Sequence, residues 1–254
     1  MTRIVKRVMP KPALMGFRRI RDAIRKRCPL DRHATVLVYQ MGKVGSTSVY
    51  RSLLACGVRA VHLHKLEPAH VRGIARKDET SIITLVREPI SRRISTFFQN
   101  FEQYTGTDYN QTTLDVNALT EVFLSSKHLR RPPLWFDTEF KSKLGVDVYD
   151  YPFPQEEGWL VIETGKYRIL ILKLELDDAI KEEVISDFLN LSDLKLVRAN
   201  VAQDKAYAET YQAFIQAIRL PEAYVEALCN ARYTRNFYTD TEIEDIRTKW
   251  LRRD

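Results

Sequence analysis

The chain has 254 residues, a hydrophobic content of 44% and a formal net charge of +7, which is enough apolar material for a sizeable core. No run approaches the ~20 apolar residues that a membrane-spanning helix needs, and the N-terminus lacks the apolar segment of a signal peptide. The 3 cysteines are widely spaced with no C-x-x-C pair, so we expect a cytoplasmic protein with neither a disulfide framework nor a zinc site.

The positive charge is concentrated in residues 1–33, a basic leader in which eleven Lys and Arg stand against two Asp and give +9. The rest of the chain therefore carries −2, which argues against a nucleic-acid-binding domain. Ala13, Phe17, Ile20 and Ile24 form a narrow apolar stripe at helical spacing. Two interpretations stay open: an amphipathic helix that lies on the anionic inner face of a membrane, or a segment that docks on the domain or is partly disordered.

The domain is predicted to begin with a buried strand over residues 35–39, a glycine-containing loop over 40–46 and a helix. Glycines allow a tight turn against a ligand, and the free N–H groups at the start of a helix favour an anion. Lys43 adds a positive charge, and hydroxyl groups follow on Ser46, Thr47 and Ser48. The lysine precedes the second glycine, so this is not a Walker A loop. The alternative is an ordinary turn with a serine at the N-cap.

A second strand is predicted over residues 58–63, followed by a short helix over 68–77. If the strand continues, side-chain alternation places His62 and His64 on the same side. Two histidines at this spacing near an anion-binding loop indicate a candidate site, whereas the alternative is a half-exposed strand with polar residues. No third ligand is evident for a metal ion.

A third buried strand over residues 82–86 ends at Arg87, and Pro89 suits the first position of a helix. That helix has an apolar face at helical spacing, formed by Ile90, Ile94, Phe97, Phe98 and Phe101. Arg87 and Ser95 lie eight residues apart, so the strand end and the second helical turn are predicted to hold one phosphate group together.

The remaining chain alternates between helices and strands. We expect a loop over 102–117, extended chain over 146–153, and strands over 159–164 and 167–174. Helices are expected over 115–128, 135–144, 177–191, 204–218, from 220 to a break at 236–238, and over 241–251. The pattern predicts an α/β fold, a single three-layer, P-loop-like domain over 34–254 with a mostly parallel central sheet and a helical C-terminal part. A ligand should lie beyond the carboxyl ends of the strands.

Four aromatic residues between the third and fourth strands are candidates for stacking on a sugar ring: Tyr104, Tyr109, Trp135 and Phe136. A place in the core is the alternative for all four, and we favour it for Phe136.

The two loop motifs together resemble those of the sulfotransferase family. There, K-x-G-[ST]-[ST] between a strand and a helix holds the 5′-phosphosulfate of 3′-phosphoadenosine-5′-phosphosulfate (PAPS), and R-[DE]-P with a serine eight residues after the arginine holds the 3′-phosphate. The residues that match are Lys43, Gly45, Ser46, Thr47 and Ser48 in the first motif and Arg87, Glu88, Pro89 and Ser95 in the second.

Two further stretches carry a resemblance. His62 and His64 are similar to the H-x-H of uronyl 2-O-sulfotransferases, which implies that His64 is the catalytic base. From the segment WFDTEFKSKLGVDVYDYPF onward, the C-terminal half resembles bacterial proteins assigned to capsular polysaccharide synthesis. With this half included, the resemblance covers residues 35–246, which is most of the chain.

The resemblance implies a PAPS-dependent sulfotransferase that moves a sulfuryl group to a hydroxyl of a carbohydrate acceptor. Lys43 would stabilise the leaving 5′-phosphate oxygen, with the N–H groups from Val44 to Ser48 cradling it, while Arg87 and Ser95 would hold the 3′-phosphate. His64 would take the proton from the acceptor, with Glu67 and Asp137 as fallback bases. No metal ion is expected, because Lys43 supplies the cation.

Two other functions remain as alternatives. One is a nucleotide-dependent kinase on a P-loop fold, although Walker A spacing and a convincing Walker B aspartate are both missing. The other is a membrane-surface binding protein that kept the fold and lost catalysis. The presence of Lys43, Arg87 and Ser95 argues against such a loss of catalysis.

Overall fold

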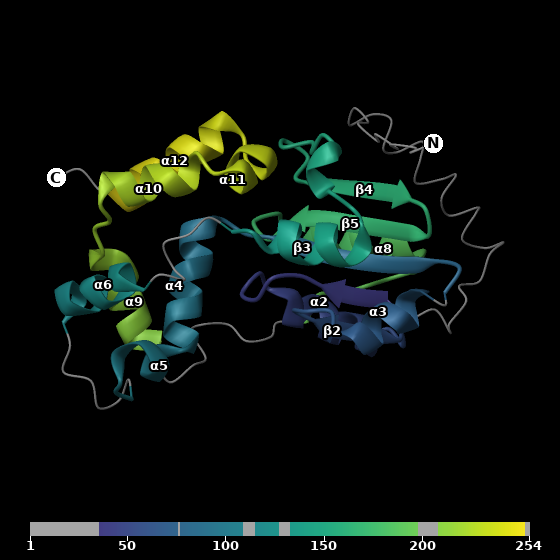
Figure 1. The fold of residues 1–254 in the computed structure, drawn as a ribbon, viewed down its shortest axis with the longest axis horizontal. Helices are drawn as coiled ribbons and strands as arrows, with labels where there is room; N and C mark the ends of the chain where they lie inside the picture. Colours follow the sequence, from purple (N-terminus) through teal and green to yellow (C-terminus); the bar gives the residue numbers. More distant parts are fainter. Residues whose placement is uncertain (1–35, 76, 109–114, 127–132, 198–207, 252–254) are drawn as a thin grey trace.

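The computed structural model describes residues 36–75, 77–108, 115–126, 133–197 and 208–251 (Figure 1). The predictions for the leader, residues 1–33, and for Tyr109 lie outside these residues. The described part is a mixed α/β structure around a five-stranded sheet with the strand order β2-β1-β3-β5-β4. The strands are β1 (Val36–Tyr39), β2 (Ala60–Leu63), β3 (Thr80–Val86), β4 (Trp159–Thr164) and β5 (Tyr167–Lys173).

The sheet is mostly parallel, as predicted. β1 pairs in parallel with β2 and β3, and β3 pairs in parallel with β5, whereas β4 is an antiparallel edge strand hairpinned to β5. Tyr39 lies opposite Leu63, and Val86 lies opposite Lys173, so the carboxyl ends of four strands meet at one edge. Figure 1 shows the arrows of β1 and β5 pointing toward the helical part of the molecule.

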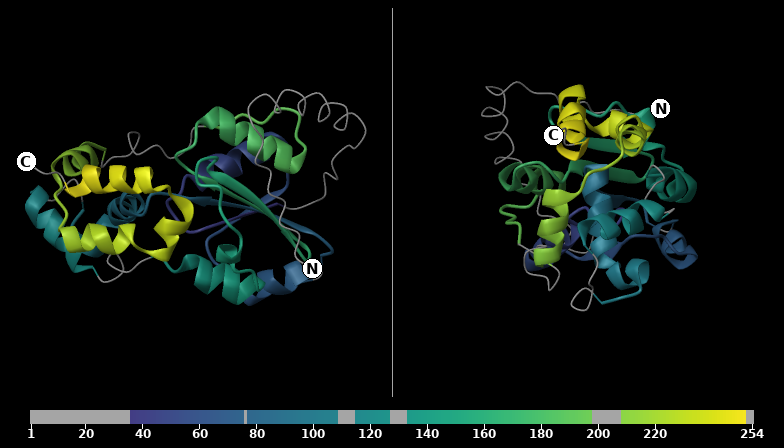
Figure 2. Two further views of the ribbon diagram at one scale, coloured as in Figure 1. Left: turned by 90° about the horizontal axis from the view of Figure 1, so that it is seen from above. Right: turned by 90° about the vertical axis from the view of Figure 1, so that its left-hand side faces the viewer.

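Helices cover both faces of the sheet. α2 (Ser46–Ala55) and α8 (Asp178–Leu189) lie on one face, while α3 (Pro68–Ala75) and the π-helix η1 (Phe136–Leu144) lie on the other (Figure 2). This double cover explains why β3 and β5 are nearly continuous apolar runs, since a parallel strand buried on both faces has no solvent side to alternate with.

The other helices pack together beyond the carboxyl ends of the strands (Figure 1). They are α4 (Pro89–Gln99), α5 (Phe101–Thr105), α6 (Val116–Ser125), α9 (Ala208–Ala217), α10 (Glu222–Cys229), α11 (Arg232–Phe237) and α12 (Asp240–Leu251). α4 begins as the sequence suggests, with Pro89 in the first turn and the Glu88 carboxylate accepting from the N–H groups of Ile90 and Ser91. Its phenylalanine face is fully buried: Phe97 packs against Phe123 and Phe214.

Two local predictions are wrong. The expected loop after Phe101 contains the short helix α5, because Phe101 anchors it in the core and Gly106 ends it in a left-handed conformation. The expected extended chain over 146–153 contains a 3₁₀ turn, η2 (Val148–Asp150), because the Asp147 carboxylate accepts from the N–H of Tyr149.

The predicted helix break at 236–238 is found at Tyr238, between the end of α11 and the start of α12. A further break, which was not predicted, lies at Asn230 and Ala231, and α11 then continues through Phe237, whose side chain is fully buried. A hydrogen bond connects α11 to the end of α10, since the Thr234 hydroxyl donates to the carbonyl of Leu228. Burial of Phe237 outweighs the weak helix propensity of its neighbours.

Candidate active site at the carboxyl edge of the sheet

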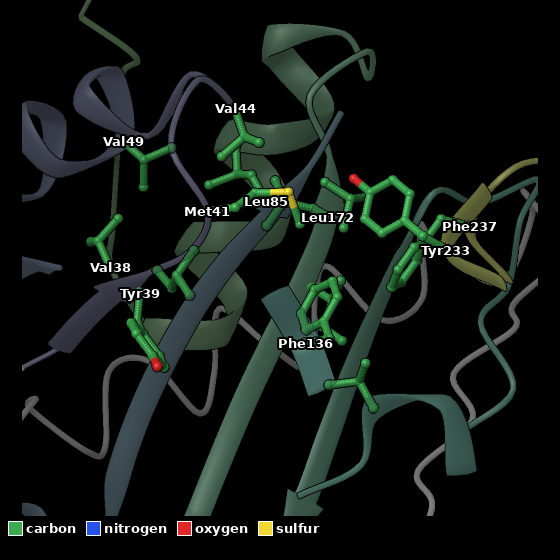
Figure 3. Close-up of a cluster of buried hydrophobic side chains, with 14 of the residues drawn as sticks. Val38, Tyr39, Met41, Val44, Val49, Leu85, Phe136, Leu172, Tyr233 and Phe237 are labelled. Atoms are coloured by element: carbon green, nitrogen blue, oxygen red, sulfur yellow. The ribbon is translucent and has the colours of Figure 1, made fainter. Parts of the chain in front are cut away.

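The loop between β1 and α2 is anchored by two apolar side chains, Met41 and Val44, which point into the core (Figure 3). Between them, Lys43 adopts a left-handed backbone conformation, with φ at 71°. A residue other than glycine seldom takes this conformation, which costs on the order of 1–2 kcal/mol. Strain of this kind persists where the surrounding structure imposes it, and it gathers at functional sites.

Gly45 occupies the N-cap position of α2, with φ at 77°, and no side chain caps the helix. The structure thus disagrees with an ordinary turn that has a serine N-cap, because the N–H groups of the first turn are left without a side-chain acceptor. A Cβ atom on residue 45 would lie only 2.4 Å from Cδ1 of Leu174, at the end of β5. The backbone therefore favours glycine here, and a Cβ atom would in addition push the end of the Leu174 side chain aside.

These two features predict the effect of Gly45→Ala, for which Gly57→Ala is a matched control. Gly57 has nearly the same φ, 73°, but open space where its Cβ would stand. Both variants should lose about 1–2 kcal/mol of stability from backbone strain. Only Gly45→Ala should also weaken anion binding, because it displaces Leu174. Thermal unfolding and ligand titration of both variants test this; equal loss of binding would show that Leu174 is irrelevant.

Two arginines from the segment after β3 hold the loop. Nη1 of Arg87 donates to the carbonyl of Lys43 at 3.0 Å, and Nη1 of Arg92 reaches the carbonyl of Gly42 at 3.5 Å. No carboxylate in the described segments forms an ion pair with Arg87 or Arg92. Burial, together with the neighbouring charge of Arg87, lowers the pKa of Arg92. A cluster of guanidinium groups without acidic partners would be stabilised by a bound anion.

The backbone of Arg87 is itself clamped by Tyr233. The N–H of Arg87 donates to the Tyr233 hydroxyl at 2.9 Å, and that hydroxyl donates back to the carbonyl of Arg87 at 3.0 Å. Tyr233 is buried, and Figure 3 shows it beside Phe237 in the core. The end of β3 is therefore positioned by a residue of α11 that sequence reasoning did not connect with the site.

The predicted hydroxyl groups have different surroundings. Ser46 is buried, with its Oγ 2.9 Å from Nε2 of His62. Ser48 instead donates to the carbonyl of Val197, so its hydroxyl serves the tertiary structure. Thr47 is half-buried, and its hydroxyl forms no hydrogen bond with the described residues. Of the three, Ser46 is the one held within a network at the N-terminus of α2.

Ser95 is buried in the second turn of α4, but the structure shows no hydrogen bond between it and Arg87 or the loop. A pocket of about 340 Å³ opens beside Arg87 instead. Its lining includes Ser91 in the first turn of α4, Leu174 and Glu175 after β5, and Lys249 of α12. Sequence reasoning did not select Ser91 or Lys249 as ligands, because nothing local shows that α12 approaches the start of α4.

One wall of this pocket is acidic. The Glu175 carboxylate accepts from the N–H of Glu88 at 2.8 Å and from the Tyr238 hydroxyl at 3.2 Å. Desolvation of the carboxylate, with a contribution from Glu88, raises the pKa of Glu175 although the residue as a whole is exposed. Arg87 and Lys249 provide the positive groups of the same pocket, so the lining can pair with both charged and hydroxyl groups of a ligand.

His62 and His64 lie on the same side of β2, as predicted, with their ring centroids 4.9 Å apart. Nδ1 of His64 is 3.0 Å from the carbonyl of Gln40, the residue that leads into the loop. Because a carbonyl only accepts, Nδ1 carries the hydrogen, and in the neutral ring Nε2 keeps a lone pair. His64 is exposed, so this nitrogen can serve as a proton acceptor.

The other candidate bases lie in different surroundings. Glu67 is exposed at the start of α3, and Asp137 on η1 faces Arg232 at 3.8 Å. A buried carboxylate that sequence reasoning missed, Glu139, accepts from the Tyr39 hydroxyl at 2.6 Å and from the N–H of Leu66. Both of its partners belong to the folded framework, so Glu139 ties η1 to the sheet.

The aromatic residues predicted to stack on a sugar also lie in different surroundings. Phe136 belongs to the core, as the alternative interpretation held, and Tyr104 stacks on Phe97. Trp135 is half-buried, and its indole N–H donates to the carbonyl of His64 at 2.9 Å. Among the three described candidates, Trp135 is the one that contacts a predicted site residue.

Neither a metal centre nor a membrane span is evident in the described segments. They contain no cluster of three or more His, Cys, Asp or Glu side chains that could hold a metal ion. None of their helices combines the length and apolar character that crossing a bilayer requires.

Comparison with known proteins gives one finding. No curated protein and no solved structure matches the chain. A family model described as "Putative capsular polysaccharide synthesis protein" matches residues 106–239, which is just over half of the chain. The match includes Trp135 and Tyr233 and begins after the loop, the two histidines and Arg87. The chain therefore belongs to this capsular polysaccharide synthesis family.

Proposed function

We propose that the protein is a sulfotransferase that moves a sulfuryl group from PAPS to a hydroxyl of a carbohydrate acceptor. The observation that carries this proposal is the uncapped N-terminus of α2 beside the strained Lys43, with Arg87 and Arg92 gathered around the same loop. The family to which the chain belongs is described by capsular polysaccharide synthesis, which supports a carbohydrate acceptor.

The proposed mechanism is an in-line displacement at sulfur, for which the protein supplies position and charge. Negative charge grows on the 5′-phosphate oxygen as the bond to sulfur breaks. Lys43 and the N–H groups of Val44 through Thr47 stabilise that oxygen, whereas the N–H of Ser48 donates to the carbonyl of Gly45. Nε2 of His64 accepts the proton of the attacking hydroxyl, since its Nδ1–H is held by Gln40. Trp135, which holds the backbone of His64, is a candidate surface for the sugar.

The 3′-phosphate of the donor is assigned to Arg87. Ser95 remains the proposed partner from the motif, while the pocket beside Arg87 adds Ser91 and Lys249 as donors from α4 and α12. Recognition of this phosphate would select PAPS over ATP. The proposal includes the three-layer, P-loop-like architecture, which is supported by helices on both faces of the sheet (Figure 2).

The alternative functions have less support. A P-loop kinase needs a carboxylate for magnesium where β3 ends, and this position is occupied by Arg87. Membrane contact through the basic leader remains a proposal about residues 1–33, as does the cytoplasmic location of the enzyme.

Arg87→Ala tests the nucleotide assignment. The wild type should bind 3′,5′-adenosine bisphosphate much more tightly than AMP, and the variant should lose about 1.5–3 kcal/mol of that preference with the charge-assisted contact. The exposed Arg72→Ala on α3 is the matched control and should keep the preference. Titration calorimetry measures both affinities. A preference that survives in Arg87→Ala would place the 3′-phosphate elsewhere.

A further inference from the structure

Ser46, His62 and Gln40 form a hydrogen-bonded cluster beside the loop. Nε2 of His62 lies 2.9 Å from Oγ of Ser46 and 2.9 Å from the amide nitrogen of Gln40. Gln40 is 0% exposed and Ser46 is 4% exposed, so water does not readily replace either contact. Two polar groups from the end of β1 and the start of α2 thus meet one ring nitrogen of β2.

The protonation of this nitrogen decides how both groups are oriented. With the ring hydrogen on Nδ1, the neutral Nε2 has one lone pair, for which the Gln40 amide and the Ser46 hydroxyl compete. When the Ser46 hydroxyl points its hydrogen at this lone pair, only its oxygen lone pairs are left for a ligand. In this state the amide oxygen of Gln40 is buried and has no hydrogen-bond partner.

Protonation at Nε2 reverses these contacts. The ring N–H donates to Oγ of Ser46, which frees the hydroxyl hydrogen to donate to an anion at the start of α2. A half turn of the Gln40 amide brings its unpaired oxygen to the same ring N–H, which Gln40 then shares with Ser46. The cluster therefore has two arrangements, and an anion favours the protonated one.

We propose that His62 is a positioning residue that couples proton uptake to the binding of a sulfate or phosphate group at the N-terminus of α2, acting through the hydroxyl of Ser46. This inference rests on the proposed function for the identity of the anion, the phosphosulfate end of PAPS. The proton is taken up from solvent and resides on Nε2 of His62 while the anion is bound.

The groups packed against His62 allow such a change. Tyr50 of α2 stacks on its ring at 5.5 Å between centroids, His64 lies at 4.9 Å just after the same strand, and Gln40 follows the end of β1. Burial and then the charge of His64 lower the pKa of His62, and no carboxylate opposes them. Without an anion the ring is neutral at pH 7, and a bound anion supplies the missing negative charge.

Anion binding should therefore depend on pH. If the anion raises the pKa of His62, binding tightens as the pH falls between the pKa of the complex and that of the free protein. Each unit of that difference corresponds to about a tenfold change in affinity.

The test is the NMR titration of the His62 ring in the full chain, with and without 3′,5′-adenosine bisphosphate or inorganic sulfate. We expect the ligand to raise its titration midpoint by on the order of one unit. Ser46→Ala should remove most of this rise and Ser46→Thr should restore it, whereas His70→Gln on α3 should not affect it. A full rise in Ser46→Ala would overturn the proposal, because direct attraction between the charges would then suffice.

Calorimetry of the wild type in two buffers of different ionisation enthalpy gives the proton uptake without any variant. His62→Gln should abolish this uptake and make binding less dependent on pH, while protonation of the ligand itself remains as a shared background. Binding of the nucleotide without proton uptake would leave the proposed function intact and overturn the coupling. A rise in the His62 midpoint with sulfate but no nucleotide binding would support the coupling and reject the assignment of PAPS.

Discussion

Lys43→Ala is expected to lower the turnover of sulfate transfer roughly 10²–10³-fold while nucleotide affinity falls much less. The reason is that Lys43 acts on charge that grows on the leaving oxygen only in the transition state. Its backbone strain, with φ at 71°, fits a side chain held in place for function. The assay is transfer of labelled sulfate from PAPS to a panel of glycans.

Lys43→Gly separates function from stability more sharply. Glycine adopts a positive φ without strain, a relief of about 1–2 kcal/mol, which offsets the roughly 0.4–1 kcal/mol lost through the greater freedom of the unfolded chain. The variant should therefore fold at least as stably as the wild type and still lose turnover. A Lys43→Gly protein with full activity would show that the lysine charge has no part in the reaction.

His64→Ala should reduce the rate about 10²–10⁴-fold and leave PAPS binding nearly unchanged, because the base faces the acceptor. At saturating PAPS, the turnover of the wild type should fall at acid pH, and this acid limb should vanish in the variant if His64 is the base. Donor binding is expected to tighten at low pH through His62, which is the opposite trend. Saturating PAPS removes this effect from the measured turnover.

His70→Ala is the matched control for His64, since His70 lies nearby on α3 with its Nδ1 accepting from the N–H of Glu67. It should keep both the rate and the pH profile. Full activity and an unchanged profile in His64→Ala would mean that the base lies elsewhere, and Glu67 and Asp137 would be examined next.

Local patterns predicted the parts of the site that depend on neighbouring residues. The β-branched run before Gln40, the glycines around Lys43 and the proline after Arg87 each determine a strand, a turn or a helix start within a few residues. The positions of Lys43, Arg87 and the two histidines at one sheet edge follow from parallel pairing.

Contacts between distant segments could not be predicted in this way. Tyr233 reaches Arg87 across 146 residues, and Ser48 reaches Val197 across 149. Hydrophobic periodicity in the sequence does not predict such pairs, because they depend on how α11 and the chain after α8 pack on the sheet. The break at Asn230 was missed for the same reason. It depends on the burial of Phe237 in the core, and local helix propensity does not predict that burial.

The partner of Ser46 is another case. The H-x-H pattern indicated His64 as the reactive histidine, and the structure places His62 against the start of α2 with Gln40. Alternation along β2 predicted that both rings share one side, but not which ring would lie against the loop.

The central claim, recognition of a nucleotide with a 3′-phosphate, is tested most directly by calorimetric titration of the wild-type protein. The titrants are 3′,5′-adenosine bisphosphate, its 2′,5′ isomer with the same charge, AMP and ATP. The account predicts that the 3′,5′ compound binds most tightly, with AMP weaker by about 1.5–3 kcal/mol for the missing contact to Arg87. Equal affinity for all four nucleotides, or tighter binding of ATP, would contradict it.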